Sequence, residues 1–291
     1  MINRLTIIGI GLIGGSLARA LRVAGHAREI IGYGRSVGNL QQAVELGVID
    51  RAEVSLPDAV RDADMIVLAV PVGNMAGILN ALGPVLPEQA VVTDVGSVKG
   101  SVIGSARAAL GARFAHFVPG HPIAGTEQSG VSASLPDLFQ RRRVILTPEA
   151  ETDSDALARV RAMWEAAGAQ VATLAAVDHD RILAASSHLP HMLAYCLMDM
   201  VVRHDDYRAI LENSAGSFSD TTRTAASDPV MWRDICLANR GALLDALRQY
   251  HADLGALVEA IEKGDAKWLC ETFTRAKHGR DILNKKTNSQ D

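Results

Sequence analysis

The sequence predicts an α/β chain in which an N-terminal doubly wound parallel sheet precedes an all-helical C-terminal domain. Three observations support this prediction. A strand, a glycine-rich turn and a helix follow one another at the N-terminus, buried-strand patterns then alternate with helical patterns, and from about residue 175 only 3.6-periodic runs of Ala, Leu, Met and Ile remain. We therefore expect a sheet domain over residues 1–174 and a helical domain over residues 175–291.

The first strand is expected at residues 5–8, where β-branched residues cluster. The sequence Gly-Ile-Gly-Leu-Ile-Gly follows from Gly9 to Gly14, and helical spacing begins at Ser16. A second strand at residues 29–33 comes after about twenty residues, as a βαβ unit requires. Further strands are expected at residues 65–70, 90–93, 114–118, 143–146 and 170–173, with a helix over residues 153–167 between the last two.

The composition is that of a folded protein without a nucleic-acid or membrane partner. Of 291 residues, 48% are hydrophobic and 21% are charged, and the net charge of −4 offers no basic surface. The uncharged run 65–87 contains Pro71, Gly83 and Pro84, which break a membrane-spanning helix. Three widely spaced cysteines favour reduced core thiols in a cytoplasmic protein over disulfides or a zinc site. Residues 284–291 are expected to form a disordered tail.

The glycine-rich turn indicates a dinucleotide-binding site, because it follows a strand and opens a helix. Gly9 allows the sharp turn, Gly11 lets the backbone approach a pyrophosphate, and Gly14 lets the helix pack closely on the strand. A glycine turn without a ligand is the alternative. This turn and the end of the strand near residue 70 supply the expected cofactor contacts, which are Gly9, Gly11, Leu12, Ile13, Gly14, Val70 and Pro71.

The end of the second strand favours NADP over NAD, although NAD remains possible. NAD enzymes usually place an acidic residue there to bind the ribose 2′-hydroxyl. This chain has Gly34, Arg35 and Ser36 instead. A guanidinium and a hydroxyl with no carboxylate beside them suit a 2′-phosphate. In the alternative interpretation, Arg35 stacks on the adenine of either cofactor.

Catalytic residues are expected beyond the carboxyl ends of the strands, where open α/β sheets bind their ligands. His121, in a Gly-His-Pro sequence on a rigid loop, is placed as a general base, and the ordinary histidine pKa near 6.5 suits proton transfer at neutral pH. A structural histidine in a turn is the alternative. Farther along, Arg223 is a candidate for binding a substrate carboxylate, or else for an ion pair with Asp220 or Asp228.

The helical half has its own candidates in Ser-His-Leu-Pro-His, residues 187–191, which interrupts an apolar helix. Helical spacing puts His188, His191 and Tyr195 on one face. Pro190 removes a backbone hydrogen bond and is expected to kink the helix. Contact with the substrate is favoured over a satisfied core histidine, and a metal site is the least favoured of the three because no third ligand is evident.

Five sequence strings resemble those of the prephenate and arogenate (cyclohexadienyl) dehydrogenases of tyrosine biosynthesis and occur in the same order. They are Gly9-x-Gly11-x-x-Gly14-Gly15-Ser16, Asp94-x-Gly96-Ser97-Val98-Lys99, Gly120-His121-Pro122-Ile123-Ala124-Gly125-Thr126-Glu127, Ser187-His188-Leu189-Pro190-His191 and Asp228-Pro229-x-Met231-Trp232. The resemblance implies a Rossmann domain, a helical domain that forms a homodimer, and oxidative decarboxylation of prephenate, or of arogenate, with reduction of NAD(P).

By position, the resemblance makes His121 the catalytic residue that hydrogen-bonds the ring hydroxyl of the substrate, with Ser97 beside it. His191 and Arg223 match substrate-binding positions. Supporting positions around the substrate are matched by Thr126, Glu127, His179 and Asp220. Two residues depart from the family pattern, since Ser219 stands where some members have lysine and Gly34 stands where NAD-preferring members have an acidic residue.

Two other functions are open at this point. A β-hydroxyacid dehydrogenase has a similar two-domain plan, but it uses a lysine on the interdomain helix, and residues 178–199 contain none. A non-catalytic NADP-sensing module would keep the glycine turn but would not need His121 and His191, whose joint presence argues against it. The sequence does not distinguish prephenate from arogenate, and it does not reveal feedback inhibition by tyrosine.

Overall fold

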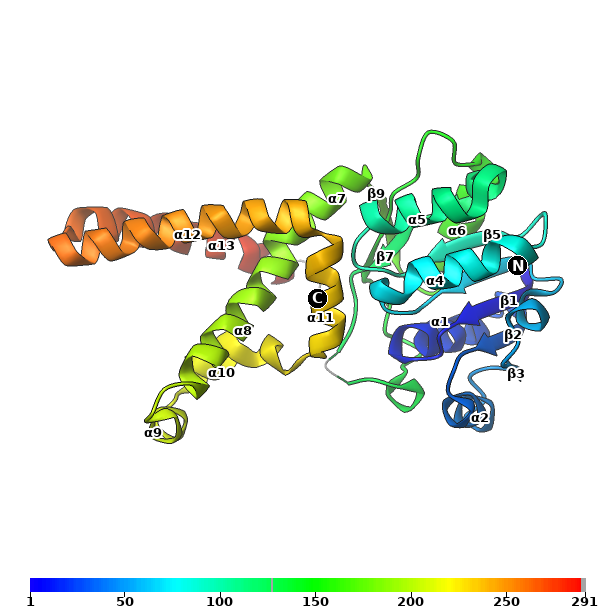
Figure 1. Ribbon diagram of the computed structural model, residues 1–291, viewed down its shortest axis with the longest axis horizontal. Helices are drawn as coiled ribbons and strands as arrows, with labels where there is room; N and C mark the ends of the chain where they lie inside the picture. The colour runs from blue at the N-terminus through cyan, green and yellow to red at the C-terminus, as the bar shows by residue number, and fades with distance from the viewer. Residues whose placement is uncertain (127, 289–291) are drawn as a thin grey trace. The chain divides into compact units, whose positions relative to one another are not determined.

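The computed structural model describes residues 1–126 and 128–288 (Figure 1). The chain divides into two compact units, Met1–Arg240 and Gly241–Asp291. This division lies inside the predicted helical domain, because helix α11 (Pro229–Ala238) packs on helix α4 (Val72–Leu82) of the sheet region. The predicted boundary near residue 174 stays a prediction.

A six-stranded parallel sheet forms the centre of the first unit. Its strands are β1 (Ile2–Ile8), β2 (Ala27–Tyr33), β3 (Arg51–Glu53), β4 (Met65–Leu68), β5 (Val91–Asp94) and β6 (Phe117–Val118). They lie in the order β3-β2-β1-β4-β5-β6 and pair in parallel throughout. The order reverses between β1 and β4, as in a doubly wound sheet, so the predicted fold class is confirmed.

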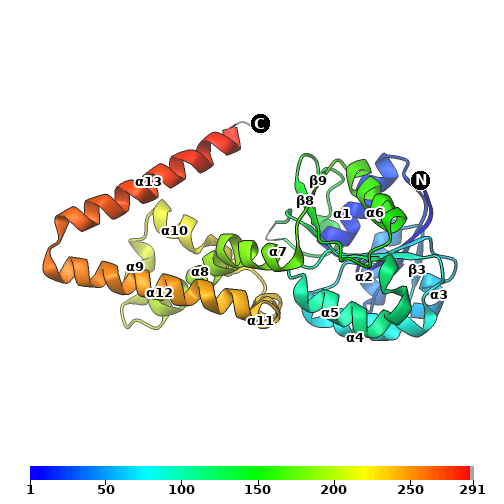
Figure 2. The same ribbon diagram turned by 90° about the horizontal axis from the view of Figure 1, so that it is seen from above.

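Helices cover both faces of this sheet (Figure 2). One face carries α1 (Leu12–Val23) and α6 (Ser154–Ala166), and the other carries α3 (Leu56–Val60), α4 and α5 (Gly100–Leu110). Short connections include α2 (Val37–Glu45), η1 (Gly83–Val85), η2 (Gly111–His116) and η3 (Val131–Ala133). The predicted helix at residues 153–167 is α6, which Asp153 caps by accepting the N–H of Ala156 at 2.8 Å.

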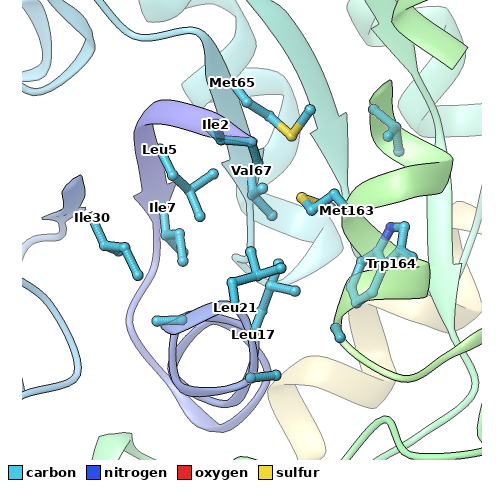
Figure 3. Close-up of a cluster of buried hydrophobic side chains, with 14 of the residues drawn as sticks. Ile2, Leu5, Ile7, Leu17, Leu21, Ile30, Met65, Val67, Met163 and Trp164 are labelled. Atoms are coloured by element: carbon cyan, nitrogen blue, oxygen red, sulfur yellow. The ribbon is translucent and has the colours of Figure 1, made fainter. Parts of the chain in front are cut away.

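The core consists of one apolar cluster on each face of the sheet. Consecutive residues of a strand point to opposite faces, so Ile7 belongs to the first cluster and Ile8 to the second. Figure 3 shows the first cluster, where Ile7 lies among Leu17 and Leu21 of α1, with Trp164 of α6 nearby. Both faces of the central strands are therefore apolar, which explains the continuous β-branched runs in the sequence.

The glycines of the N-terminal turn meet three different surroundings. Gly9 has a φ of +100°, and a Cβ there would lie 2.4 Å from the Ala69 carbonyl oxygen. A Cβ on Gly14 would lie 2.2 Å from the Gly9 carbonyl oxygen and 3.0 Å from Ile7. In contrast, a Cβ on Gly11 would meet nothing within 4 Å. The fold thus requires glycine at the first and third positions, whereas the second lies beside open space.

A second, three-stranded sheet holds the residue predicted to be the general base. It consists of β7 (Gly120–Pro122), β8 (Arg143–Leu146) and β9 (Gln170–Thr173). The last two agree with the predicted strands at residues 143–146 and 170–173. His121 was expected on a loop, which is wrong, because β7 pairs antiparallel with β8 and places His121 opposite Ile145. A three-residue strand between glycine and proline has no pattern of its own and forms only through this pairing.

The described residues after β9 form helices and the turns between them. The first unit contains α7 (Ala176–Leu183), the π-helical turn η4 (Ala184–His188), α8 (Leu189–Val202), α9 (Tyr207–Glu212), α10 (Gly216–Thr222), the 3₁₀ turn η5 (Arg223–Ala226) and α11. Helices α12 (Arg240–Lys263) and α13 (Ala266–Asn288) follow. The predicted disorder from residue 284 is wrong as far as residue 288, because α13 continues to that point.

The prediction that the cysteines are core residues is wrong. The cysteines were expected in the core, but Cys196 and Cys270 are exposed and Cys236 is half-buried, and all three are free thiols. Within the described residues, none of the helices has both the length and the apolar content needed to cross a membrane.

The glycine turn yields a test of the fold. Gly14→Ala should destabilise the protein by about 1–3 kcal/mol, because the added methyl group overpacks the contact between α1 and β1. Gly11→Ala should cost less than about 1 kcal/mol, since the backbone there is extended and the methyl group enters open space. Urea unfolding of both variants measures the difference. Equal losses in the two variants would contradict the packing described here.

Candidate active site

The turn between β1 and α1 has the features needed to hold a pyrophosphate. Helix α1 begins without a side-chain cap, so the backbone N–H groups of its first turn are available to an anion. Leu12 and Ile13 lie in this turn and are half-buried. The open space beside Gly11 allows the close approach of a ligand. The turn therefore has room for the pyrophosphate of the predicted nicotinamide dinucleotide, which a fully packed turn would exclude.

The residues predicted to select the cofactor lie between β2 and α2. Arg35 is exposed, and Ser36 caps α2 by accepting the N–H of Asn39 at 3.3 Å. A side chain on Gly34 would make only an ordinary contact with Leu40, at 3.7 Å. The lack of a carboxylate at this position is therefore not imposed by packing. Asn39 also donates from Nδ2 to the Ile10 carbonyl at 2.7 Å, which ties α2 to the glycine turn.

A hydrogen-bonded chain of three side chains joins β7 to α7. Nδ1 of His121 lies 2.8 Å from Nε2 of His179, and Nδ1 of His179 lies 2.8 Å from Oδ1 of Asp180. The carboxylate of Asp180 also accepts the backbone N–H groups of Lys99 and Gly100, each at 2.8 Å, and so caps α5 from α7. His179 is fully buried and His121 is half-buried. The structure thus brings together two histidines that are distant in the sequence.

The direction of these hydrogen bonds follows from Asp180. An ionised carboxylate only accepts hydrogen bonds, so Nδ1 of His179 donates to it. The other nitrogen of a neutral His179 is then an acceptor, and Nδ1 of His121 must donate to it. Consequently Nε2 of His121 carries a lone pair. This nitrogen makes no hydrogen bond to the described residues, so it is available to take a proton from a ligand.

Charges and burial keep this arrangement in the required protonation state. Burial alone would raise the pKa of Asp180, but the hydrogen bonds from His179 and from two backbone N–H groups outweigh it and hold the pKa below its ordinary value. The pKa of His121 lies well below its ordinary value, first because of desolvation and then because of the Lys99 ammonium, His179 and His188. His121 is therefore neutral at neutral pH.

His188 closes the π-helical turn η4 and faces the same cluster. Its Nδ1 lies 3.0 Å from Nδ2 of Asn239, which also donates to the Asp180 carbonyl at 2.9 Å. Burial lowers the pKa of His188 to about 4. Because an amide nitrogen only donates, the neutral His188 ring carries its hydrogen on Nε2, which has no partner among the described residues. The sequence predicts a helix kink at Pro190. The irregularity in the structure is the π turn η4, which lies one turn earlier.

His191 lies on Trp232 of α11. The two rings are stacked, with centroids 3.7 Å apart and an interplanar angle of 22°, and Nδ1 of His191 lies 2.9 Å from the Ser187 carbonyl. Desolvation lowers the pKa of His191, the hydrogen bond to Ser187 raises it, and the positive charge of Arg223 lowers it again, so the net direction is downward. The exposed Arg223 thus lies near enough to act on His191. Arg223 is suited to an anionic group, whereas Nε2 of the neutral His191 ring can only accept a hydrogen bond, because Nδ1 donates to the Ser187 carbonyl.

His188 and His191 meet at the same aromatic ring, as helical spacing predicted. The His188 and Trp232 centroids lie 6.0 Å apart in an edge-on arrangement. Tyr195 does not join them through its hydroxyl group, which donates to the Ser227 carbonyl at 2.6 Å. Among the described residues there is no group of three His, Cys, Asp or Glu side chains that could hold a metal ion.

The contacts of the remaining predicted site residues do not assign them a role in the site. Ser97 is half-buried in the loop between β5 and α5, and its hydroxyl makes no hydrogen bond to His121. Thr126 is exposed and accepts the N–H of Gln128 at 3.2 Å. Asp220 is exposed on α10, and Glu127 lies outside the described residues. The site roles of these four residues stay predictions.

Val70 and Pro71 lie where β4 passes into α4, as the prediction for the end of this strand requires. Val70 is half-buried, and Pro71 is the exposed N-cap of α4. Pro71 has no side-chain acceptor for the first turn of the helix. Their predicted contact with the cofactor stays a prediction.

Sequence reasoning missed several residues on which this cluster depends. Asp180 and Asn239 had no assigned role, and Trp232 was noted only as part of a string. Asp180 could have been found from its position next to His179, because a carboxylate beside a histidine commonly fixes the tautomer of the ring. Asn239 carries no local signal, since its two hydrogen bonds reach residues more than 50 positions away.

Several known proteins similar to this chain are prephenate, arogenate or cyclohexadienyl dehydrogenases. Two family models match the chain, "Prephenate dehydrogenase, nucleotide-binding domain" over residues 17–173 and "Prephenate dehydrogenase, dimerization domain" over residues 175–275. A cyclohexadienyl dehydrogenase of Zymomonas mobilis is 40% identical over 283 residues, which are 97% of this chain and 96% of the relative.

Two solved structures are also similar. Prephenate dehydrogenase from Aquifex aeolicus, in complex with hydroxyphenyl propionate and NAD+, has a TM-score of 0.91 and 36% identity, covering 97% of this chain and 99% of that one. Arogenate dehydrogenase from Synechocystis has a TM-score of 0.81 and 30% identity, covering 96% and 99% of the two chains. The chain belongs to the prephenate dehydrogenase family.

Proposed function

We propose that this chain converts prephenate to 4-hydroxyphenylpyruvate and carbon dioxide, with reduction of a nicotinamide dinucleotide, in tyrosine biosynthesis. The observation that carries this proposal is the chain of His121, His179 and Asp180, which leaves a neutral histidine with an available acceptor nitrogen beyond the carboxyl ends of the strands. Membership of the prephenate dehydrogenase family supports it. Arogenate is the second candidate substrate, which the likeness to the Synechocystis enzyme favours.

The cofactor supplies the acceptor for a hydride. Gly9, Gly11 and Gly14 shape the turn that would hold its pyrophosphate, with the N–H groups of Leu12 and Ile13 in the first turn of α1. Val70 and Pro71, at the end of β4, are proposed to complete the site. The protein contributes position and electrostatics, since the redox chemistry belongs to the cofactor.

His121 handles the only proton that the protein must move. As hydride leaves the ring carbon that bears the hydroxyl group, Nε2 of His121 takes the hydroxyl proton and a carbonyl forms. This carbonyl is conjugated through the ring with the carbon that bears the carboxylate. Carbon dioxide then leaves, and the electron pair of the broken carbon–carbon bond makes the ring aromatic. The oxygen becomes a phenolate that regains a proton from His121, so the imidazole returns to its neutral state.

The substrate carries carboxylates, and cationic or donating side chains are proposed to bind them. Arg223, whose charge acts on the His191 ring, is proposed to bind a carboxylate. His191 is proposed to contact the substrate through Nε2, which is an acceptor in the neutral ring because Nδ1 donates to the Ser187 carbonyl. Ser97, Thr126, Glu127 and Asp220 are proposed to line the same site. His179 was expected to support the substrate directly. Since both of its nitrogens are engaged with His121 and Asp180, we propose that it acts through His121 instead.

A homodimer is proposed through the helical region. In Gly241–Asp291, the described residues bury few large apolar side chains, and Leu254, Val258, Ile261 and Phe273 are 45–63% exposed. Apolar faces of this extent are usually covered by a partner. The family model that matches residues 175–275 is that of a dimerization domain, which supports the same proposal. We also propose that the functional boundary between cofactor and substrate domains lies near residue 174.

The experiment that tests the function measures reduced nicotinamide at its absorbance maximum with prephenate or arogenate and with NAD or NADP. Wild type should turn over prephenate, and His121→Asn should lower turnover by about 10²–10⁴-fold while cofactor affinity is retained. Wild-type kcat should fall as the pH drops through the pKa of His121, which lies below 6.5, because the protonated ring cannot act as a base. His121→Asn should lose this acid limb.

His26→Asn is a matched control, because His26 is also half-buried but lies at the start of β2. It should keep the wild-type kcat and pH profile. Turnover of His121→Asn within a few-fold of wild type would make His121 a structural residue. Absence of turnover with all four combinations of substrate and cofactor would refute the proposed function.

We further propose that NADP is used at least as well as NAD. Arg35 and the hydroxyl of Ser36 can meet a 2′-phosphate, and nothing at Gly34 repels it. Gly34→Asp should shift the ratio of kcat/KM values toward NAD, and Arg35→Ala should weaken NADP while sparing NAD. Arg28→Ala, an exposed arginine on the same strand, is the control. Fixed ionic strength is needed because salt screens these contacts. Strong selectivity for NAD with no effect of Arg35→Ala would overturn this proposal.

A further inference from the structure

A buried ion pair contacts Gly120, the residue that precedes the proposed base. Asp94 is the last residue of β5, and Lys99 immediately precedes α5. Both side chains are 0% exposed, and the Lys99 ammonium donates to Oδ2 of Asp94. Lysine is almost never fully buried unless it is paired. Such a pair costs desolvation energy that a pair of apolar residues would avoid, so its presence calls for a reason other than stability.

The pair holds both polar groups of the residue before His121. Nζ of Lys99 donates to the Gly120 carbonyl at 2.6 Å, and Oδ1 of Asp94 accepts the Gly120 N–H at 3.1 Å. Gly120 also packs closely against β5, because a Cβ there would lie 3.0 Å from the Asp94 carbonyl oxygen. The backbone from which the imidazole of His121 projects is therefore fixed on two sides.

Lys99 also touches the other end of the hydrogen-bonded chain. Its backbone N–H donates to Oδ1 of Asp180, the atom that accepts from His179. The side chain of Lys99 thus contacts β7, the strand that carries His121. Its backbone contacts Asp180, the carboxylate that orients the ring of His179. Any shift of Lys99 displaces both ends together.

We propose that Asp94 and Lys99 are a positioning pair for His121, which fixes the place of the acceptor nitrogen Nε2. This inference rests on the proposed role of His121 as the base. The groups that face His121 are Lys99 from the loop before α5, His179 from α7 and His188 from η4, and each of them lowers its pKa. Burial lowers the pKa of Lys99 itself, while the charge and the hydrogen bond of Asp94 oppose that effect, so the ammonium form of Lys99 depends on its partner.

The test uses the double variant Lys99→Met with Asp94→Asn. Removing Lys99 alone would leave a buried unpaired carboxylate and unfold the protein. The double variant keeps similar volumes, and the asparagine can still accept the Gly120 N–H. We expect kcat to fall about 10- to 100-fold, because a small misplacement of a reacting group has such an effect. The affinity for reduced cofactor, measured by fluorescence, should stay within about threefold of wild type.

A second measurement separates positioning from stability. The double variant removes both charges of the pair. Lys99 is the largest charge influence on the pKa of His121 and lowers it, whereas Asp94 is not among the main influences, so the acid limb of the kcat profile should move to higher pH. Arg113→Met is the control. Arg113 also clamps two backbone carbonyls, those of Gly83 and Leu86, but it does so at η1. This control should lose stability without any change in the acid limb.

NMR titration of the imidazole of His121 in cofactor-free protein makes the test independent of the reaction. The signal is assigned by its loss in His121→Asn. A higher His121 pKa in the double variant supports the inference even if neither prephenate nor arogenate is turned over, an outcome that would refute only the proposed function. An unchanged His121 titration, or a kcat and acid limb equal to those of wild type in a folded double variant, would overturn the inference and leave the pair a structural one.

Discussion

The carboxylate of Asp180 is the contact on which the site depends. It caps α5 through two backbone N–H groups and accepts the hydrogen of His179 at the same time. The first contact fixes α7 against the N-terminus of α5, and the second determines which nitrogen of each imidazole carries hydrogen. Because a carboxylate cannot donate, Asp180 determines which atom donates in the hydrogen bond to His179 and, through the neutral His179 ring, in the hydrogen bond to His121. One ionised group therefore couples the fold to the chemistry.

The electrostatic surroundings of the base suit a reaction in which a histidine must remove a proton. A histidine in water is partly protonated near neutral pH, and a protonated ring cannot accept a further proton. Here burial, the Lys99 ammonium and two neighbouring histidines all disfavour the charged ring. Burial also keeps His188 neutral, with a pKa of about 4. Arg223 is an exposed cation whose charge acts on His191, and an anionic substrate would bind near it.

The sequence predicted the elements whose patterns are local. The β-branched run of β1, the glycine turn and the alternation of buried strands and helices follow from side-chain period and backbone sterics, so β8, β9 and α6 were placed to within about one residue. The likeness to a family then pointed to His121 and His191, and also to His179. The structure adds the distances among them.

What could not be predicted depends on contacts between distant residues. The strand β7 exists only because β8 pairs with it, and the π turn η4 is shaped by packing rather than by Pro190 alone. Likewise, the link from Asn239 to His188 joins two histidine-bearing segments without any local motif. The exposed cysteines and the helical residues 284–288 were misjudged because burial and helix length are set by tertiary context.

The most direct test of this account is the tautomer of His121, observed by ¹⁵N NMR of histidine-labelled protein and assigned with His121→Asn. The hydrogen bonds predict a neutral ring protonated on Nδ1, with Nε2 showing the shift of an unprotonated nitrogen, at a pH above 7. Asp180→Asn should weaken this preference, because an amide can present a donor to His179 where the carboxylate could not. A neutral His121 protonated on Nε2 in the wild-type protein would contradict the account, since the nitrogen proposed to accept the substrate proton would already carry one.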